Sequence, residues 1–138
     1  MRNMPADALP TLSATPFAIA HQNIDRFESL DRMIRSYHGN QHRSDLINHY
    51  IDTGLDLATD AGEQGLTRLQ ESWLRRMYST LRDAGINPLL PEHWRQACLE
   101  SLYQPFFALQ HLYKKRFDGA YALRYLSREM QVIAGYLL

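Results

Sequence analysis

The sequence predicts an all-α protein, a single-domain bundle of five or six short helices preceded by a proline-punctuated N-terminal arm. Apolar residues recur at three- and four-residue spacing through most of the chain, which is the period of a helix with one buried face. No stretch alternates apolar and polar residues with β-branched enrichment, and valine occurs only once. Glycine and proline interrupt the helical pattern at intervals that suit tight turns.

Length and composition place the protein among globular domains. The chain has 138 residues, of which 45% are hydrophobic and 22% charged, enough for one domain with its own core. No apolar run is long enough to span a bilayer. Residues 18–20 resemble a signal-peptidase site, but Asp7, Pro10 and Pro16 interrupt the apolar region that should precede it. We therefore expect a cytoplasmic protein with no membrane contact.

The first half of the chain predicts an arm and two helices. Three prolines in residues 1–22 prevent a continuous helix and indicate an extended or partly disordered arm. The bundle domain is expected over residues 23–138, and its first helix should begin with Asn23 as the N-cap and end near Gly39. A second helix is expected over residues 44–61, where Gly54 indicates a bend or the close approach of another helix.

The second half predicts three or four more helices. A third helix is expected over residues 66–84, with a buried stripe formed by Leu66, Leu69, Trp73, Met77, Leu81 and Ala84. A fourth should begin after Pro91, and Pro105 should either kink it or start a fifth. Asp118 is a candidate N-cap for the last helix.

The last helix, over residues 118–138, carries two apolar faces. One consists of Leu123, Leu126, Met130, Ile133, Ala134 and Leu137. The other consists of Tyr121, Tyr125, Val132 and Tyr136, with Arg128 beside it. A helix covered only by its own domain needs one such face, so this helix is either central to the fold or gives one face to a partner. We expect these five residues to bind a partner protein or a second copy of the chain.

A polar stripe on the second helix suggests a metal site as an alternative. His42, Asp45, His49, Asp52 and Asp56 follow three- and four-residue spacing, and their side chains are common metal ligands. The stripe lies almost opposite the apolar face of that helix, however, whereas metal sites in bundles are built from side chains that point into the core. A solvated polar face is the favoured interpretation.

The charges are balanced overall but not along the chain. Residues 1–64 hold nine acidic and five basic residues, whereas residues 65–138 hold six acidic and ten basic residues. Seven of these ten form the group that could contact a partner: Arg75, Arg76, Lys114, Lys115, Arg116, Arg124 and Arg128. We expect them to lie on solvated faces and in intramolecular ion pairs, with an acidic protein surface as the sharper alternative. Nucleic-acid binding is less favoured because the chain carries no net positive charge.

No catalytic motif is present. The chain lacks a glycine-rich phosphate loop and a nucleophile elbow, and its single Cys98 shares a helical face with apolar residues. Glu71, Glu100 and Glu129 have no evident acid–base partner in the sequence. We therefore expect a non-enzymatic interaction or regulatory protein without a cofactor. This outline is common to many bacterial regulators, secretion chaperones and phage inhibitors, and it identifies no single family.

Overall fold

The computed structural model describes residues 16–41 and 43–136, with side chains described from residue 21 onward. This part of the chain contains six α-helices and no strand. The helices are α2 (Pro16–Arg35), α3 (Ser44–Glu63), α4 (Thr67–Ile86), α5 (Glu92–Ser101), α6 (Tyr103–Lys115) and α7 (Ala120–Ala134). The predicted all-α single-domain bundle is confirmed.

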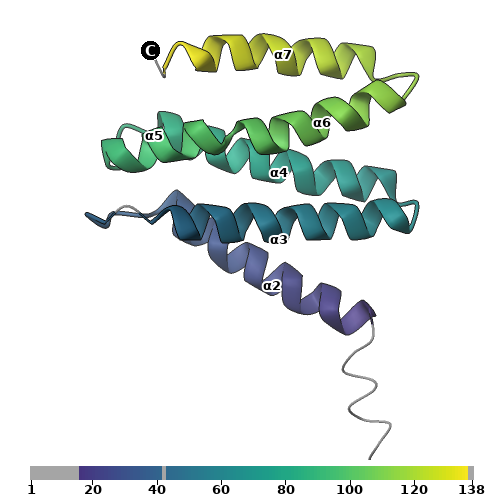
Figure 1. Ribbon diagram of the computed structural model, residues 1–138, viewed down its shortest axis with the longest axis horizontal. Helices are drawn as coiled ribbons and strands as arrows, with labels where there is room; N and C mark the ends of the chain where they lie inside the picture. Colours follow the sequence, from purple (N-terminus) through teal and green to yellow (C-terminus); the bar gives the residue numbers. More distant parts are fainter. Residues whose placement is uncertain (1–15, 42, 137–138) are drawn as a thin grey trace, which may run out of the picture.

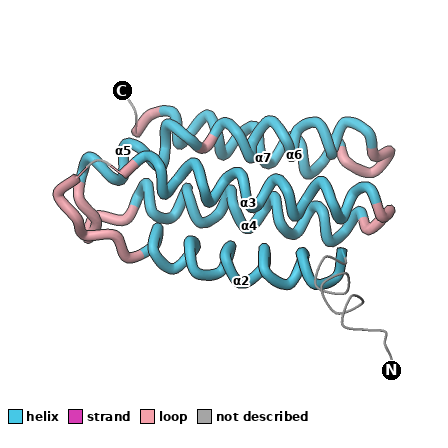
Figure 2. The backbone as a smooth tube through the Cα atoms, turned by 60° about the horizontal axis from the view of Figure 1, so that its bottom comes forward, coloured by secondary structure: helices cyan, strands magenta, loops and turns pink. Residues whose placement is uncertain are grey.

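The helices form a stack in which α4 is central. It packs against α2 and α3 on one side and against α5 and α6 on the other. Figure 1 shows α2 at one edge of the stack and α7 at the opposite edge, and in Figure 2 α2 is again at one edge while α6 and α7 lie together at the other. Among the helices described, none combines the length and apolar content that crossing a bilayer requires.

The core is densely packed where α2, α3 and α4 meet. Phe27 and Tyr50 stack with ring centroids 4.7 Å apart, and both side chains are fully buried. A Cβ atom on Gly54 would collide with the side chains of Met77 and Phe27. The predicted close approach at Gly54 is therefore confirmed, because only a residue without a side chain lets the helices come so near.

A buried carboxylate links the same three helices. Asp31 of α2 accepts hydrogen bonds from Tyr50 of α3 at 2.6 Å and from Thr80 of α4 at 2.8 Å. Arg35, one turn further along α2, donates to the other carboxylate oxygen at 2.7 Å. We call these residues the Asp31 network. It satisfies a charge that would otherwise be costly to bury.

Two predicted helix starts are wrong. Helix α2 begins at Pro16, so residues 16–22 are helical and Asn23 lies inside the helix instead of capping it. Proline suits the first helical position because its missing N–H needs no partner there. Residues 1–15 of the predicted arm lie outside the described part. Helix α7 is preceded by Gly119, and Asp118 instead forms an ion pair with Arg116 at 3.2 Å.

At Pro105 the structure decides between the two sequence interpretations. Helix α5 ends at Ser101 and α6 begins at Tyr103, so Pro105 lies in the first turn of a separate helix. The first turn tolerates proline, because its backbone N–H groups lack partners within the helix.

The predicted buried stripe of the third helix is only partly correct. Met77, Leu81 and Ala84 are buried, but Leu66 and Leu69 are 47% and 44% exposed, and Trp73 is partly exposed. Leu66 directly precedes α4 and Leu69 lies in its first turn, where the chain turns from α3 into α4 at one end of the stack (Figure 1). Neighbouring helices give less cover there, so a correct helical period does not produce burial along the whole helix.

Candidate functional site

Helix α7 lies at the edge of the fold and packs mainly against α6. Its inner face contributes Leu126 and Ile133 to the core, and Leu123 and Met130 are partly buried against it. The alternative in which the last helix is central is therefore wrong, and that position belongs to α4. Ala134 is exposed, and Leu137 lies outside the described residues.

The opposite side of α7 is open. Tyr121, Tyr125, Val132 and Tyr136 are 74%, 62%, 68% and 62% exposed. Arg128 is also exposed, and Tyr136 directly follows the final turn of the helix. We call these five residues the α7 face. The structure thus gives the predicted partner-binding residues the accessibility that binding requires.

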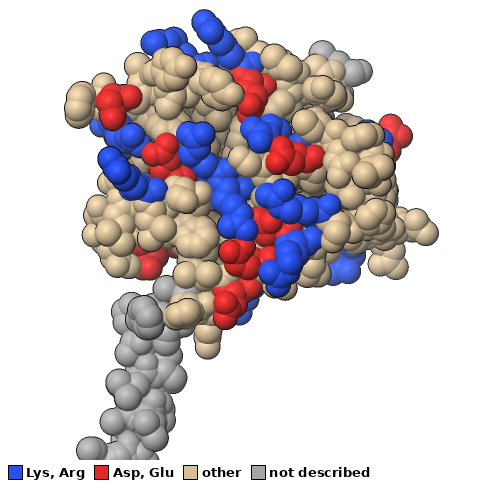
Figure 3. All heavy atoms as spheres, turned by 180° about the vertical axis from the view of Figure 1, so that it is seen from behind, with Lys and Arg blue, Asp and Glu red and all other residues tan. Residues whose placement is uncertain are grey.

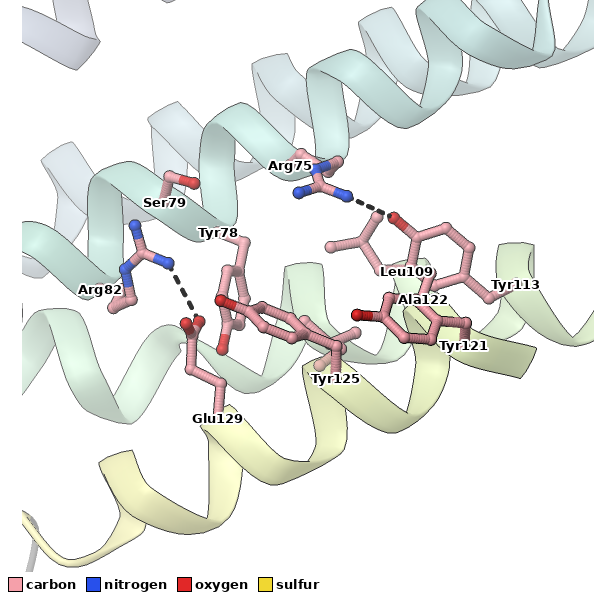
Figure 4. Close-up of a pocket in the computed structure, with 11 residues that line it drawn as sticks. Arg75, Tyr78, Ser79, Arg82, Leu109, Tyr113, Tyr121, Ala122, Tyr125 and Glu129 are labelled. Carbon is pink, nitrogen blue, oxygen red and sulfur yellow. Dashed lines mark hydrogen bonds and ion pairs between the residues drawn. The ribbon is translucent and has the colours of Figure 1, made fainter. Parts of the chain in front are cut away.

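A groove of about 320 Å³ separates α7 from α4. Figure 4 shows Tyr121 and Tyr125 on the side of α7 that is turned toward α4, and it shows Tyr113 of α6 with its hydroxyl pointing at Arg75. The residues that line it are Arg75, Tyr78, Ser79, Arg82, Leu109, Tyr113, Tyr121, Ala122, Tyr125, Leu126 and Glu129. The α4 residues recur at three- and four-residue spacing, so helical geometry places them on one wall.

Ion pairs and hydrogen bonds join the walls of the groove. Arg82 of α4 donates to Glu129 of α7 at 3.0 Å. Arg75 of α4 donates to the Tyr113 hydroxyl of α6 at 3.2 Å. The same hydroxyl donates to Glu71 at 2.6 Å. These contacts hold α7 and α6 at a defined distance from α4.

The Tyr78 hydroxyl is a buried polar group at one wall of the groove. It has no hydrogen-bond partner among the residues described. Burial, and next the neighbouring Glu129 carboxylate, raise the pKa of Tyr78, because both disfavour the phenolate.

Arg75, Arg76 and Arg82 of α4, and Arg116 just after α6, have acidic partners within the molecule. Arg76 pairs with Glu28, and Arg116 pairs with Glu71 at 2.6 Å. Figure 3 shows the result on one face, where basic and acidic side chains are interleaved. Arg124 and Arg128 of α7 are exposed and form no ion pair with the other residues described. Arg128 thus adds an unpaired positive charge to the α7 face, and Arg124 adds one beside it. Lys114 and Lys115 of α6 likewise have no ion-pair partner among the residues described.

The predicted His/Asp stripe lies on the surface of α3. Asp45, His49, Asp52 and Asp56 are exposed, and His42 lies outside the described residues. Asp45 pairs with Arg43 at 2.9 Å, and this hydrogen-bonded partner lowers the pKa of Asp45 to about 2. Nowhere in residues 16–41 or 43–136 do three or more His, Cys, Asp or Glu side chains gather as a metal site requires.

Cys98 is fully buried in α5. Burial raises the pKa of its thiol to about 12, because the apolar surroundings disfavour the thiolate. Cys98 is thus a small core residue, in keeping with its place on an apolar helical face in the sequence.

Sequence reasoning missed the groove and the pairing of two carboxylates. Glu71 and Glu129 seemed isolated in the sequence, yet each binds an arginine. The regular spacing of Arg75, Tyr78 and Arg82 was an available signal for one wall. That α7 forms the other wall depends on how the chain folds back, and no local pattern records it.

The comparisons with known proteins place the chain in no family. No family model matches it, and no curated protein or solved structure is significantly similar to it. The functional interpretation therefore depends on the α7 face and the groove.

Proposed function

We propose that this protein is a non-enzymatic helical interaction protein that binds a partner protein through the α7 face. One observation carries the proposal: an edge helix leaves three tyrosines and a valine more than half exposed on one side. Clustered exposed apolar residues are typical of protein-binding surfaces. Tyrosine and arginine are also enriched where proteins meet, since each combines a large contact area with hydrogen bonding.

Charge favours a partner with an acidic and apolar contact surface over a second copy of the chain. Position 128 lies near the middle of the segment from Tyr121 to Tyr136. In an antiparallel pair of α7 helices, the Arg128 side chains of the two copies would approach each other near the two-fold axis. Like charges in that arrangement oppose association, whereas carboxylates of a different protein would pair with Arg124 and Arg128.

Nucleic acid is a weaker candidate for this surface. Phosphate binding needs arginines that are free to replace counterions. On the neighbouring wall of α4, Arg82 is already paired with Glu129, and this carboxylate would repel a phosphate backbone. The observations thus support a protein partner.

The test compares Tyr125→Ala with Tyr103→Ala, an exposed tyrosine on α6 outside the α7 face. The partner is first captured from the native host and purified, and it is then titrated against each variant. Tyr125→Ala should bind the partner at least about tenfold more weakly than the unmodified protein does. Tyr103→Ala should bind as the unmodified protein does. Thermal melts should coincide for all three, because Tyr103 and Tyr125 are 50% and 62% exposed.

Two outcomes would contradict this proposal. One is a partner retained equally by Tyr125→Ala and the unmodified protein. The other is concentration-dependent dimerisation in sedimentation that Tyr125→Ala abolishes, which would assign the α7 face to self-association instead.

A further inference from the structure

We propose that the groove between α4 and α7 binds a small aromatic monocarboxylate. This inference goes beyond partner binding by the α7 face, because it concerns a pocket that a free small molecule would occupy. The volume of about 320 Å³ lies at the lower end of the range for ligand pockets. It suits a ligand of one or two rings.

The walls and floor of the groove favour an aromatic ring. Tyr78, Tyr121 and Tyr125 offer ring faces and edges from two helices (Figure 4). Leu109 and Leu126 supply a buried apolar floor. A planar ligand can be stacked or held edge-on by such tyrosines while its apolar surface leaves water.

Arg75 provides a positive charge with unused donors at the rim. Its side chain is 60% exposed, and its only hydrogen bond to the described residues goes to the Tyr113 hydroxyl. The nearest carboxylate, Glu71, is 3.6 Å away, and Tyr113 and Arg116 bind Glu71 more closely at 2.6 Å each. The remaining guanidinium N–H groups can therefore bind a ligand carboxylate in a bidentate manner.

The other charges of the groove limit the ligand to a single negative charge. Arg82 is held by Glu129 and Asp83, each at 3.0 Å, so it adds no free positive charge. Glu129 itself lines the groove. A phosphate carries nearly two negative charges at neutral pH and would meet this carboxylate with only Arg75 to compensate it. A carboxylate, with one negative charge, matches the single free positive charge of Arg75 better.

Three matched ligands test the inference on ¹⁵N-labelled full-length protein at pH 7.5: 2-naphthoate, its neutral amide 2-naphthamide, and 2-naphthyl phosphate. We expect 2-naphthoate to give saturable NMR shifts at the backbone amides of Leu109, Tyr121 and Tyr125. It should bind at least about tenfold more tightly than the amide, because a charge-assisted hydrogen bond is lost in the amide. The phosphate should bind no more tightly than 2-naphthoate.

Two variants assign the binding to the groove. Arg75→Gln should reduce the affinity for 2-naphthoate to that for the amide, whereas Arg124→Gln, a matched exposed arginine away from the groove, should leave the difference intact. Ser79→Phe, which fills the groove from the α4 wall, should remove binding of both ligands. Thermal melts establish that each variant is folded.

The inference is overturned if no ligand produces saturable shifts at the groove. Equal affinity for acid and amide, or tighter binding of the phosphate, would also overturn it. An equal loss of affinity for 2-naphthoate in Arg75→Gln and Arg124→Gln would overturn it as well. Such a result would mean that the ligand responds to the overall surface charge and not to the guanidinium at the rim of the groove.

Discussion

Asp31 shows how one polar residue can organise a core. Its side chain is nearly inaccessible, yet it lies on the apolar stripe of α2 between Phe27 and Ile34. Burial alone would raise the pKa of Asp31, but hydrogen bonds from Tyr50, Arg35 and Thr80 outweigh it and the pKa is lowered. The carboxylate is therefore charged when the protein is folded.

Asp31→Asn should destabilise the protein by about 3–5 kcal/mol, because removing one member of a buried ionic network leaves its partners uncompensated. Urea unfolding followed by circular dichroism measures the loss. Asp45→Asn is the control, since that carboxylate also pairs with an arginine but is exposed, and its unfolding midpoint should not move. Equal midpoints for the two variants would contradict a stabilising role for the Asp31 network.

At the scale of elements, α7 has less support than the other long helices. It packs mainly on α6, whereas α3 and α4 have several neighbours each. Regions with few buried contacts open more readily than the core. The Arg82–Glu129 ion pair is the link from α7 to α4 that resists such opening.

Native-state hydrogen exchange should therefore show the amides of α7 exchanging faster than those of α3 and α4. Arg82→Gln should increase exchange in α7 further, because it removes the link to α4. Arg43→Gln, which removes an exposed ion pair on another element, is the control and should leave α7 unchanged. Uniform protection across all helices would contradict the edge position of α7 as a source of local opening.

The sequence could predict features that lie within one helix, but not those that depend on contacts between helices. The α7 face was predictable because Tyr121, Tyr125 and Val132 repeat within one helix, and the spacing alone separates them from the buried stripe. The groove and the Asp31 network were not, because Thr80 and Glu129 meet their partners only through the packing of different helices. Asp31 could have been noticed as a charge on an apolar stripe, although its partners could not have been named.

At the scale of the molecule, two carboxylates connect the helices across the stack. Asp31 joins α2 to α3 and α4, while Glu71 of α4 accepts hydrogen bonds from Tyr113 of α6 and from Arg116, just after that helix. Burial would raise the pKa of Glu71, but these two hydrogen bonds and the arginine charges lower it. Both groups therefore bind protons less readily in the folded protein than in the unfolded chain.

This difference fixes the direction of the pH dependence. A carboxyl with a lowered pKa contributes stability above its ordinary value of about 4 and loses it as the pH falls toward the folded-state pKa. The free energy of unfolding, measured in urea between pH 5 and pH 3 at constant ionic strength, should therefore decrease with falling pH. Asp31→Asn and Glu71→Gln should each flatten this decrease, and the double variant should flatten it more, because the two sites share no partner. A decrease as steep in the double variant as in the unmodified protein would mean that other carboxylates control acid unfolding, and that these two links do not hold the stack together.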